Sequence, residues 1–148
     1  MQYSSGRQSA FLQEYLEESE DLINEIEEII LDLEKEPSQE HLLDCLMRTL
    51  HSFKGSAQLM GLDPIVTVAH AMETLVSRFR HQEIRDGISV PPGEQDSGGR
   101  LTELNLRCVD LLRTLSDELK ISGACMQDVS PVLAEIDKVS TRQVPSNK

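Results

Sequence analysis

The chain has 148 residues, which is enough for one domain with a single core, or a compact bundle with a tail, and two domains are not expected. Aromatic residues make up only 3% of the sequence and tryptophan is absent, so an all-α fold packed through aliphatic side chains is favoured over a β-sandwich or barrel. The formal net charge of −12, with eleven acidic residues and one lysine between positions 11 and 36, argues against direct binding to nucleic acid.

The first predicted helix runs from about Ser9 to Glu36, with apolar residues at helical spacing beneath an acidic outer face. Its predicted core positions are Phe11, Leu12, Tyr15, Leu16, Leu22, Ile23, Ile26, Ile30 and Leu33. Pro37 ends this helix, and Ser38 is the predicted N-cap of a second helix that closes at Gly61. The core stripe of the second helix is Leu43, Leu46, Leu50, Phe53, Ala57 and Met60.

The third helix is predicted to start at Asp63 and Pro64, an N-cap oxygen followed by proline at the first helical position, and to reach about Gln82. Its buried positions are Ile65, Ala69, Met72, Leu75, Val76 and Phe79. Residues 83–99 hold six glycines and prolines and few apolar residues, which predicts a long mobile loop.

A fourth helix is predicted from near Gly99 to Gly123, and a fifth from Ser130 to about Ser140. Their core positions are Leu101, Leu104, Cys108, Leu111, Leu112, Leu115 and Leu119, then Leu133, Ile136 and Val139. Short turns between amphipathic helices predict an antiparallel up-down four-helix bundle with a short additional C-terminal helix. We expect one domain over residues 1–142, and a disordered tail or the start of a linker over residues 143–148.

Three cysteines, Cys45, Cys108 and Cys125, are odd in number and form no CxxC spacing, so we interpret them as reduced thiols. No stretch approaches 18 consecutive apolar residues, and the N-terminus lacks a positive segment followed by an apolar one. These features predict a cytoplasmic chain that is neither secreted nor inserted into a membrane.

Polar residues gather on one side of the second helix. His51, Lys54, Gly55 and Gln58 fall within a sector of about 100° when plotted at helical periodicity. A glycine inside a helix costs roughly 1 kcal/mol relative to alanine, so Gly55 needs a reason. Because helical side chains lean toward the N-terminus, the side chain missing at Gly55 would have covered His51. Exposure of the imidazole to a partner is one explanation, and close packing of a neighbouring helix is the other.

Counting along the second and third helices gives His51 its predicted neighbours. His51 lies ten residues before Gly61 and Glu73 ten residues after Asp63, whereas Lys54 and His70 lie seven before and after the turn. A carboxylate that accepts one ring N–H of an imidazole fixes its tautomer, so the other nitrogen can act as a nucleophile. We assign that carboxylate to Glu73. If the imidazole attacks a phosphorus atom, the ammonium group of Lys54 can offset the negative charge of the phosphoryl group. The alternative is an exposed histidine beside an ordinary surface lysine and glutamate.

Three segments carry a resemblance to a known family. LHSFKGSA at residues 50–57, LMGL at 59–62 and AHAME at 69–73 closely resemble the phosphotransfer (P1) domain of CheA-type chemotaxis histidine kinases. The likeness in helix order and spacing covers about residues 9–121, including the acidic first helix. It implies a histidine phosphotransfer domain, part of a two-component signalling system.

The resemblance also assigns roles. It implies that His51 is phosphorylated on its outward ring nitrogen by a CheA-type kinase domain, in cis or in trans, and passes the phosphoryl group to an aspartate of a response-regulator receiver. The motif lysine, glycine, histidine and glutamate of the family correspond to Lys54, Gly55, His70 and Glu73. Ser56 departs from the glycine or alanine found in many relatives, and the loop over residues 83–99 is longer than expected.

Docking of partners is expected around His51, where Met47, Arg48 and Gln58 surround the motif. The acidic first helix is interpreted as a solvated face or as a device that steers partners. No cofactor or metal is expected in this domain: ATP and Mg²⁺ would belong to the kinase and a second Mg²⁺ site to the receiver. The chain lacks a P-loop and the glycine-rich nucleotide-binding segments of a kinase, so it cannot phosphorylate itself.

The sequence therefore leaves open whether the chain is classed as an enzyme, and a fragment of a sensor histidine kinase is the expected context. The domain itself is expected to be monomeric.

Two other functions are compatible with a helical bundle. A metal-binding bundle would use His41, His51, His70 and His81, but Glu-x-x-His pairs are absent and only the reversed order of His70 and Glu73 occurs. A helical scaffold that has lost phosphotransfer would not need the complete set of histidine, lysine, glycine and glutamate.

Overall fold

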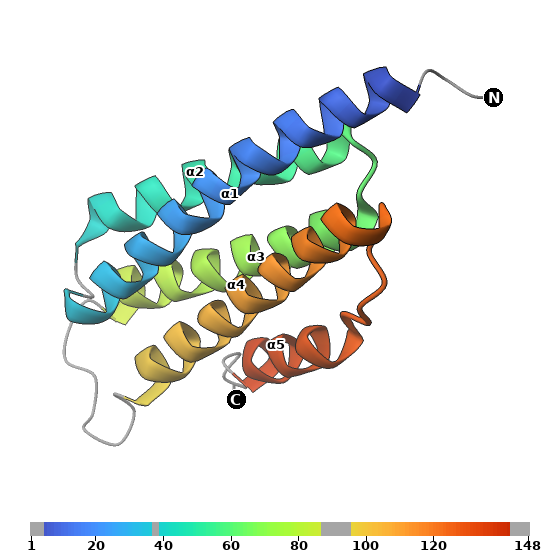
Figure 1. Cartoon of the computed structure of the whole chain (residues 1–148). Helices are drawn as coiled ribbons and strands as arrows, with labels where there is room; N and C mark the ends of the chain where they lie inside the picture. The colour runs from blue at the N-terminus through green and yellow to red at the C-terminus, as the bar shows by residue number, and fades with distance from the viewer. Residues whose placement is uncertain (1–4, 37–38, 87–95, 143–148) are drawn as a thin grey trace.

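The computed structural model describes residues 5–36, 39–86 and 96–142, together with the side chains of residues 10–36, 39–78 and 102–138. The described helices are α1 (Ser5–Lys35), α2 (Glu40–Leu59), α3 (Asp63–Asp86), α4 (Asp96–Ser122) and α5 (Ser130–Arg142) (Figure 1). Within these residues no helix is long and apolar enough to cross a membrane.

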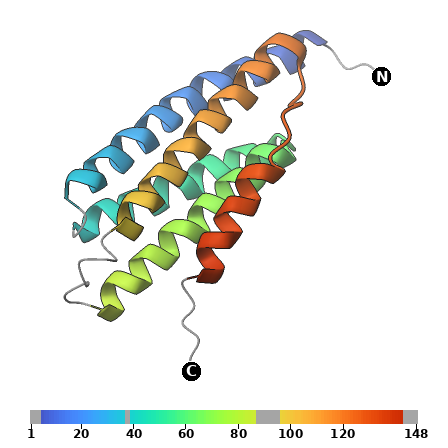
Figure 2. The same ribbon diagram turned by 90° about the horizontal axis from the view of Figure 1, so that it is seen from below.

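Four of the helices form an antiparallel bundle. α1 packs against α2 and α4, and α3 packs against the same two helices, so each helix of the bundle has two neighbours. α5 contacts α3 and α4 and lies along the outside of the bundle, as Figure 2 shows. The predicted fold class, an all-α four-helix bundle with a short C-terminal helix, is confirmed.

The core consists of the aliphatic stripes that the sequence predicts. Leu50, Phe53 and Ala57 of α2 are completely buried, as are Ala69 and Met72 of α3. Burial of each large aliphatic side chain stabilises the fold by about 1.5–3 kcal/mol, so the α2–α3 contact is fixed along its length. Further buried positions that the predicted stripes omitted are Ile29, Val68 and Val109.

Phe11 was expected in the core, and this prediction is wrong. Its side chain is 58% exposed, although Tyr15 and Leu16, one turn further along α1, are buried. The side chains of Phe79, Leu101 and Val139 lie outside the described residues, and Leu133 is half-buried.

The start of α2 differs from the predicted one. Gln39 occupies the N-cap position, its side chain makes no capping hydrogen bond, and the helix begins at Glu40. The predicted cap, Ser38, lies outside the described residues. The acidic side chain of Glu40 in the first turn complements the helix dipole, which lessens the need for a capping side chain.

The turn between α2 and α3 fixes the register of the site. Gly61 has φ = 70°, a left-handed conformation that glycine adopts without steric cost. The N–H of Leu62 donates to Ala57 O at 3.0 Å and that of Gly61 to Gln58 O at 3.0 Å, which satisfies the last carbonyls of α2. α3 begins at Asp63 itself, one residue before the predicted first helical position.

The predicted loop over residues 83–99 is too long. α3 continues to Asp86 and α4 already begins at Asp96. Residues 83–86 contain no glycine or proline that would interrupt a helix, and Asp96 and Ser97 suit the first turn of a helix. Only residues 87–95 remain between the helices, and the predicted mobility concerns residues outside the described ones.

A short linker joins α4 to α5. Gly123, at φ = 80°, ends α4 as predicted. Glu118 Oε1 accepts the backbone N–H groups of Met126 at 2.8 Å and Gln127 at 2.9 Å. The Asp128 carboxylate accepts the N–H of Ser130 at 3.0 Å, and this hydrogen bond lowers the pKa of Asp128. Side-chain oxygens therefore hold the linker in place.

Candidate functional site

His51 lies near the middle of α2 on its outer side. The two residues that flank it in the core stripe, Leu50 and Phe53, are completely buried, so the backbone of α2 is fixed against the bundle. The His51 side chain is 78% exposed. A rigid helix therefore presents a solvent-accessible imidazole.

Glu73 of α3 contacts both His51 and Lys54. Glu73 Oε2 lies 3.3 Å from His51 Nδ1, and Glu73 Oε1 accepts a hydrogen bond from Lys54 Nζ at 2.7 Å. The structure thus brings together three of the residues that the sequence assigns to the site, and His51 lies beside Glu73 as counting from the turn predicts.

The Glu73 carboxylate has little access to water, with a side chain that is 11% exposed. A carboxylate in such a place requires strong partners, and the Lys54 ammonium, itself only 17% exposed, supplies the opposite charge. Because Lys54 holds Oε1, Oε2 is directed at the imidazole. The short Lys54 contact orients the carboxylate.

This geometry distinguishes the two ring nitrogens of His51. The contact with Glu73 Oε2 favours the tautomer whose Nδ1–H donates to the carboxylate. Nε2 then carries the lone pair, on a side chain that is 78% exposed. A nucleophilic nitrogen that faces solvent can attack an electrophile held by another protein.

Two site residues differ from the sequence-based expectation in their contacts. Lys54 is paired with Glu73, a contact that the sequence reasoning did not include, although a lysine and a glutamate on facing flanks of two antiparallel helices were its signal. His70 is exposed on α3, and its imidazole makes no hydrogen bond to His51, Lys54 or Glu73.

Gly55 lies on the surface beside His51. A Cβ built at Gly55 would meet no atom within 4 Å, so no neighbouring helix requires a glycine there. The close-packing explanation of Gly55 is therefore wrong for the described residues. The absence of a side chain at Gly55 leaves space next to the imidazole. This agrees with the other explanation, that Gly55 exposes His51 to a partner.

The remaining predicted residues surround this surface. Arg48 and Gln58 are exposed, whereas Met47 and Ser56 are half-buried. Within the described part of the chain, no group of three or more histidine, cysteine, aspartate or glutamate side chains is arranged to hold a metal ion.

Three comparisons relate the chain to known proteins. The family model for the Hpt domain matches residues 10–120. Chemotaxis protein CheA of Listeria monocytogenes is 23% identical over 123 residues, which are 83% of this chain and 18% of that protein. The gliding motility regulatory protein of Myxococcus xanthus is 29% identical over 132 residues, or 86% of this chain and 15% of that protein. The chain thus spans less than a fifth of the length of these curated relatives.

A solved structure shares the fold. The phosphorylated P1 domain of CheA3 from R. sphaeroides, crystallised in complex with CheY6, superposes with a TM-score of 0.65 and 22% sequence identity. The match covers 90% of this chain and 94% of that one.

Proposed function

Because the chain belongs to the Hpt domain family, we propose that it carries a phosphoryl group on His51 between a CheA-type kinase domain and the receiver domain of a response regulator. The single observation that carries this proposal is the contact between Glu73 Oε2 and His51 Nδ1 at 3.3 Å, on an imidazole that is 78% exposed. It leaves Nε2 free to react at the surface.

The first step loads the carrier. The Nε2 lone pair attacks the γ-phosphorus of ATP held by the kinase, a P–N bond forms, and the bond to the bridging oxygen of ADP breaks. Positive charge develops on the ring during the attack, and the Glu73 carboxylate stabilises it through the Nδ1–H. Lys54 keeps Glu73 in position and lies within one helical turn of the incoming phosphoryl charge.

The second step unloads the carrier. An aspartate oxygen of the receiver attacks the same phosphorus, the P–N bond breaks, and its electron pair returns to Nε2. The missing side chain at Gly55 and the exposed positions of Arg48 and Gln58 let a partner approach the imidazole closely. His70, one turn from Glu73, belongs to the same accessible surface.

The catalytic machinery of both steps belongs to the partners. ATP and Mg²⁺ are bound by the kinase domain and a further Mg²⁺ by the receiver, and this domain acts as their substrate. The chain is proposed to be the phosphotransfer domain, over residues 1–142, of a longer cytoplasmic chemosensory kinase, and to act as a monomer. Residues 143–148 would begin the linker.

The decisive experiment is a phosphorylation assay. The chain is incubated with the catalytic domain of a CheA-type kinase and radiolabelled ATP, and then with a CheY-type receiver. Acid-labile label is expected on the wild-type chain, followed by loss of that label to the receiver. His51→Gln should acquire no label and should unfold at the same temperature as wild type, because residue 51 is exposed.

Two results would refute the proposal. Label on the His51→Gln variant would move the acceptor to another residue. Absence of label on a folded wild-type chain, with a kinase that labels its own phosphotransfer domain, would favour a helical scaffold that has lost phosphotransfer.

A further inference from the structure

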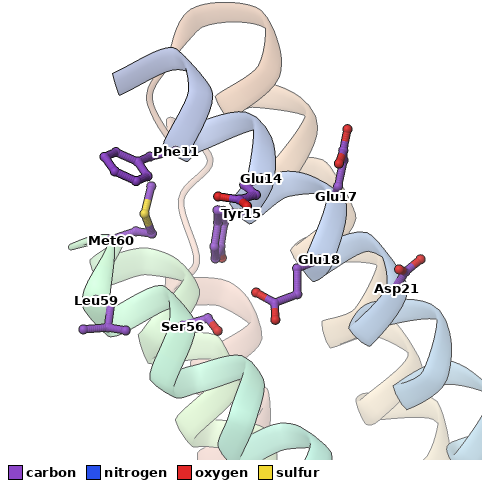
Figure 3. A pocket seen from close by; sticks show the side chains of 9 residues that line it. All are labelled: Phe11, Glu14, Tyr15, Glu17, Glu18, Asp21, Ser56, Leu59 and Met60. Carbon is purple, nitrogen blue, oxygen red and sulfur yellow. The ribbon is translucent and has the colours of Figure 1, made fainter. Parts of the chain in front are cut away.

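A groove lies between the N-terminal half of α1 and the C-terminal end of α2 (Figure 3). Its volume is about 560 Å³, which accommodates several side chains of a partner. The residues that line it are Phe11, Glu14, Tyr15, Glu17, Glu18 and Asp21 of α1, with Ser56, Leu59 and Met60 at the end of α2. We call it the α1–α2 groove.

The α1–α2 groove carries four carboxylates, and no lysine or arginine is among its lining residues. None of the four makes a salt bridge within the described part of the chain. Neighbouring carboxylates repel one another, so a cation that enters the groove relieves this repulsion in addition to pairing. The charge of the groove therefore selects a basic occupant.

Two further features of the groove indicate a protein as its occupant. Phe11 and Leu59, at its rim, are 58% and 91% exposed, and exposed large apolar side chains on both sides of a cleft favour an apolar anchor. Tyr15 points between the two helices, as Figure 3 shows, and is only 5% exposed. Its hydroxyl is buried, so Tyr15 contributes an apolar ring rather than a hydrogen-bonding group to the base of the groove.

The groove adjoins the surface around His51. Ser56 lies five residues after His51, or about 7.5 Å along the axis of α2. The residues between them on the surface of α2 are small, namely Ser52 and Gly55, and Gly55 has open space above it. One element of a partner can therefore lie over the imidazole and continue into the α1–α2 groove without meeting a large side chain.

We propose that the α1–α2 groove is a docking site for a basic segment of the receiver, one that inserts a large apolar side chain flanked by lysine or arginine while the receiver's aspartate reaches His51. This inference rests on the proposed function. The receiver is favoured as occupant because it must find the chain by diffusion, whereas a kinase domain on the same polypeptide is present at a high effective concentration and needs little docking surface.

The test uses the chain phosphorylated at His51 by a CheA-type kinase domain. Its receiver is the one that accepts the phosphoryl group fastest from the wild-type chain, out of the CheY-type receivers of the same organism. The rate of transfer is measured against receiver concentration for the wild type and for Glu14→Lys/Glu18→Lys. We expect the half-saturating concentration to rise on the order of tenfold, and the rate at saturation to stay within about twofold.

A matched control is Glu28→Lys/Asp32→Lys. These residues are exposed, have the same spacing on α1 and change the net charge equally, but they do not line the groove. The control should change the half-saturating concentration by less than about threefold, since only the long-range field is altered. A milder groove variant, Leu59→Gln, should raise it severalfold without preventing folding, because Leu59 is 91% exposed.

The possible results separate the two proposals. Equal effects of the groove and control variants, or unchanged transfer in all groove variants, would overturn the docking site while the phosphotransfer function stands. Slower labelling by the kinase with normal transfer to the receiver would also overturn it, because the groove would then bind the kinase. A wild-type chain that acquires no label at His51 would refute the proposed function itself.

Discussion

At the level of single residues, the site depends on one carboxylate with two partners. Glu73 receives an ammonium on one oxygen and an imidazole N–H on the other, and it is largely screened from water. A carboxylate held in this way cannot rotate away from His51 without losing the Lys54 ion pair. We therefore interpret Lys54 first as the residue that positions Glu73.

Glu73→Ala should slow the phosphorylation of His51 on the order of tenfold or more, because the imidazole loses the group that fixes its tautomer and stabilises its charge. Glu73→Gln keeps an oxygen acceptor but not the negative charge, so its rate should lie between those of wild type and Glu73→Ala. The measurement is kcat/KM for labelling by a kinase domain. Equal rates for wild type and Glu73→Ala would remove Glu73 from the mechanism.

Gly55 should show opposite effects on stability and function. Open space at the missing Cβ means that Gly55→Ala meets no neighbour, and alanine in a helix is favoured over glycine by about 1 kcal/mol. The free energy of unfolding in urea should therefore rise by up to about that amount. The added methyl group beside His51 should at the same time raise the KM for the kinase domain. A less stable Gly55→Ala variant would show that packing explains the glycine.

At the level of the helices, the sequence predicted which residues are buried more accurately than it predicted where each helix starts and ends. Burial is strongly favoured for a stripe of apolar side chains at helical spacing. The predicted stripe of α2 is buried at Leu43, Leu46, Leu50, Phe53 and Ala57. Helix ends depend on smaller differences of about 1 kcal/mol, such as a capping oxygen. The predicted Ser38 cap and the predicted helix starts and ends near residues 83 and 99 were wrong for this reason.

Some contacts of the site could not be predicted from the apolar pattern of a single helix. Counting residues from the tight turn at Gly61 predicted that Glu73 and His51 lie at the same height along α3 and α2, because both helices are joined at that turn. The α1–α2 groove could not be predicted in this way, because the height of two residues along their helices does not show whether the side chains between them leave an open groove. Phe11 follows the apolar spacing of α1 but lies beyond the part of the helix that its neighbours cover.

The linker between α4 and α5 depends on one side chain of α4. Glu118 accepts two backbone N–H groups, so Glu118→Ala should lower the free energy of unfolding by about 1 kcal/mol and Glu118→Gln by less. Hydrogen exchange at Met126 and Gln127 should accelerate in the alanine variant. Because α5 packs mainly against α3 and α4 and does not carry His51, labelling of His51 should be unchanged. Slower labelling would show that α5 contributes to the site.

At the level of the whole molecule, two buried acids that are neutral at pH 7 limit stability in alkaline solution. Burial raises the pKa of the Tyr15 hydroxyl to about 12 and that of the Cys108 thiol to about 12. In the unfolded chain these groups ionise near pH 10 and pH 9. The folded state therefore retains protons that the unfolded state has already released, so stability falls as the pH rises.

The stabilising effect of both groups is fully present below pH 9 and is lost as the pH rises toward their folded pKa of about 12. Each group should reduce the free energy of unfolding by at most roughly 1 kcal/mol per pH unit within its window. Urea unfolding of wild type and Tyr15→Phe at pH 8 to 11.5 isolates the phenol, because Cys108 and all other ionisable groups are common to the two proteins. The difference in stability should be constant at about pH 8 to 9 and should then shift in favour of Tyr15→Phe above about pH 10. Parallel curves over the whole range would mean that Tyr15 ionises as easily in the folded bundle as in the unfolded chain, and that the hydroxyl at the base of the α1–α2 groove is open to water.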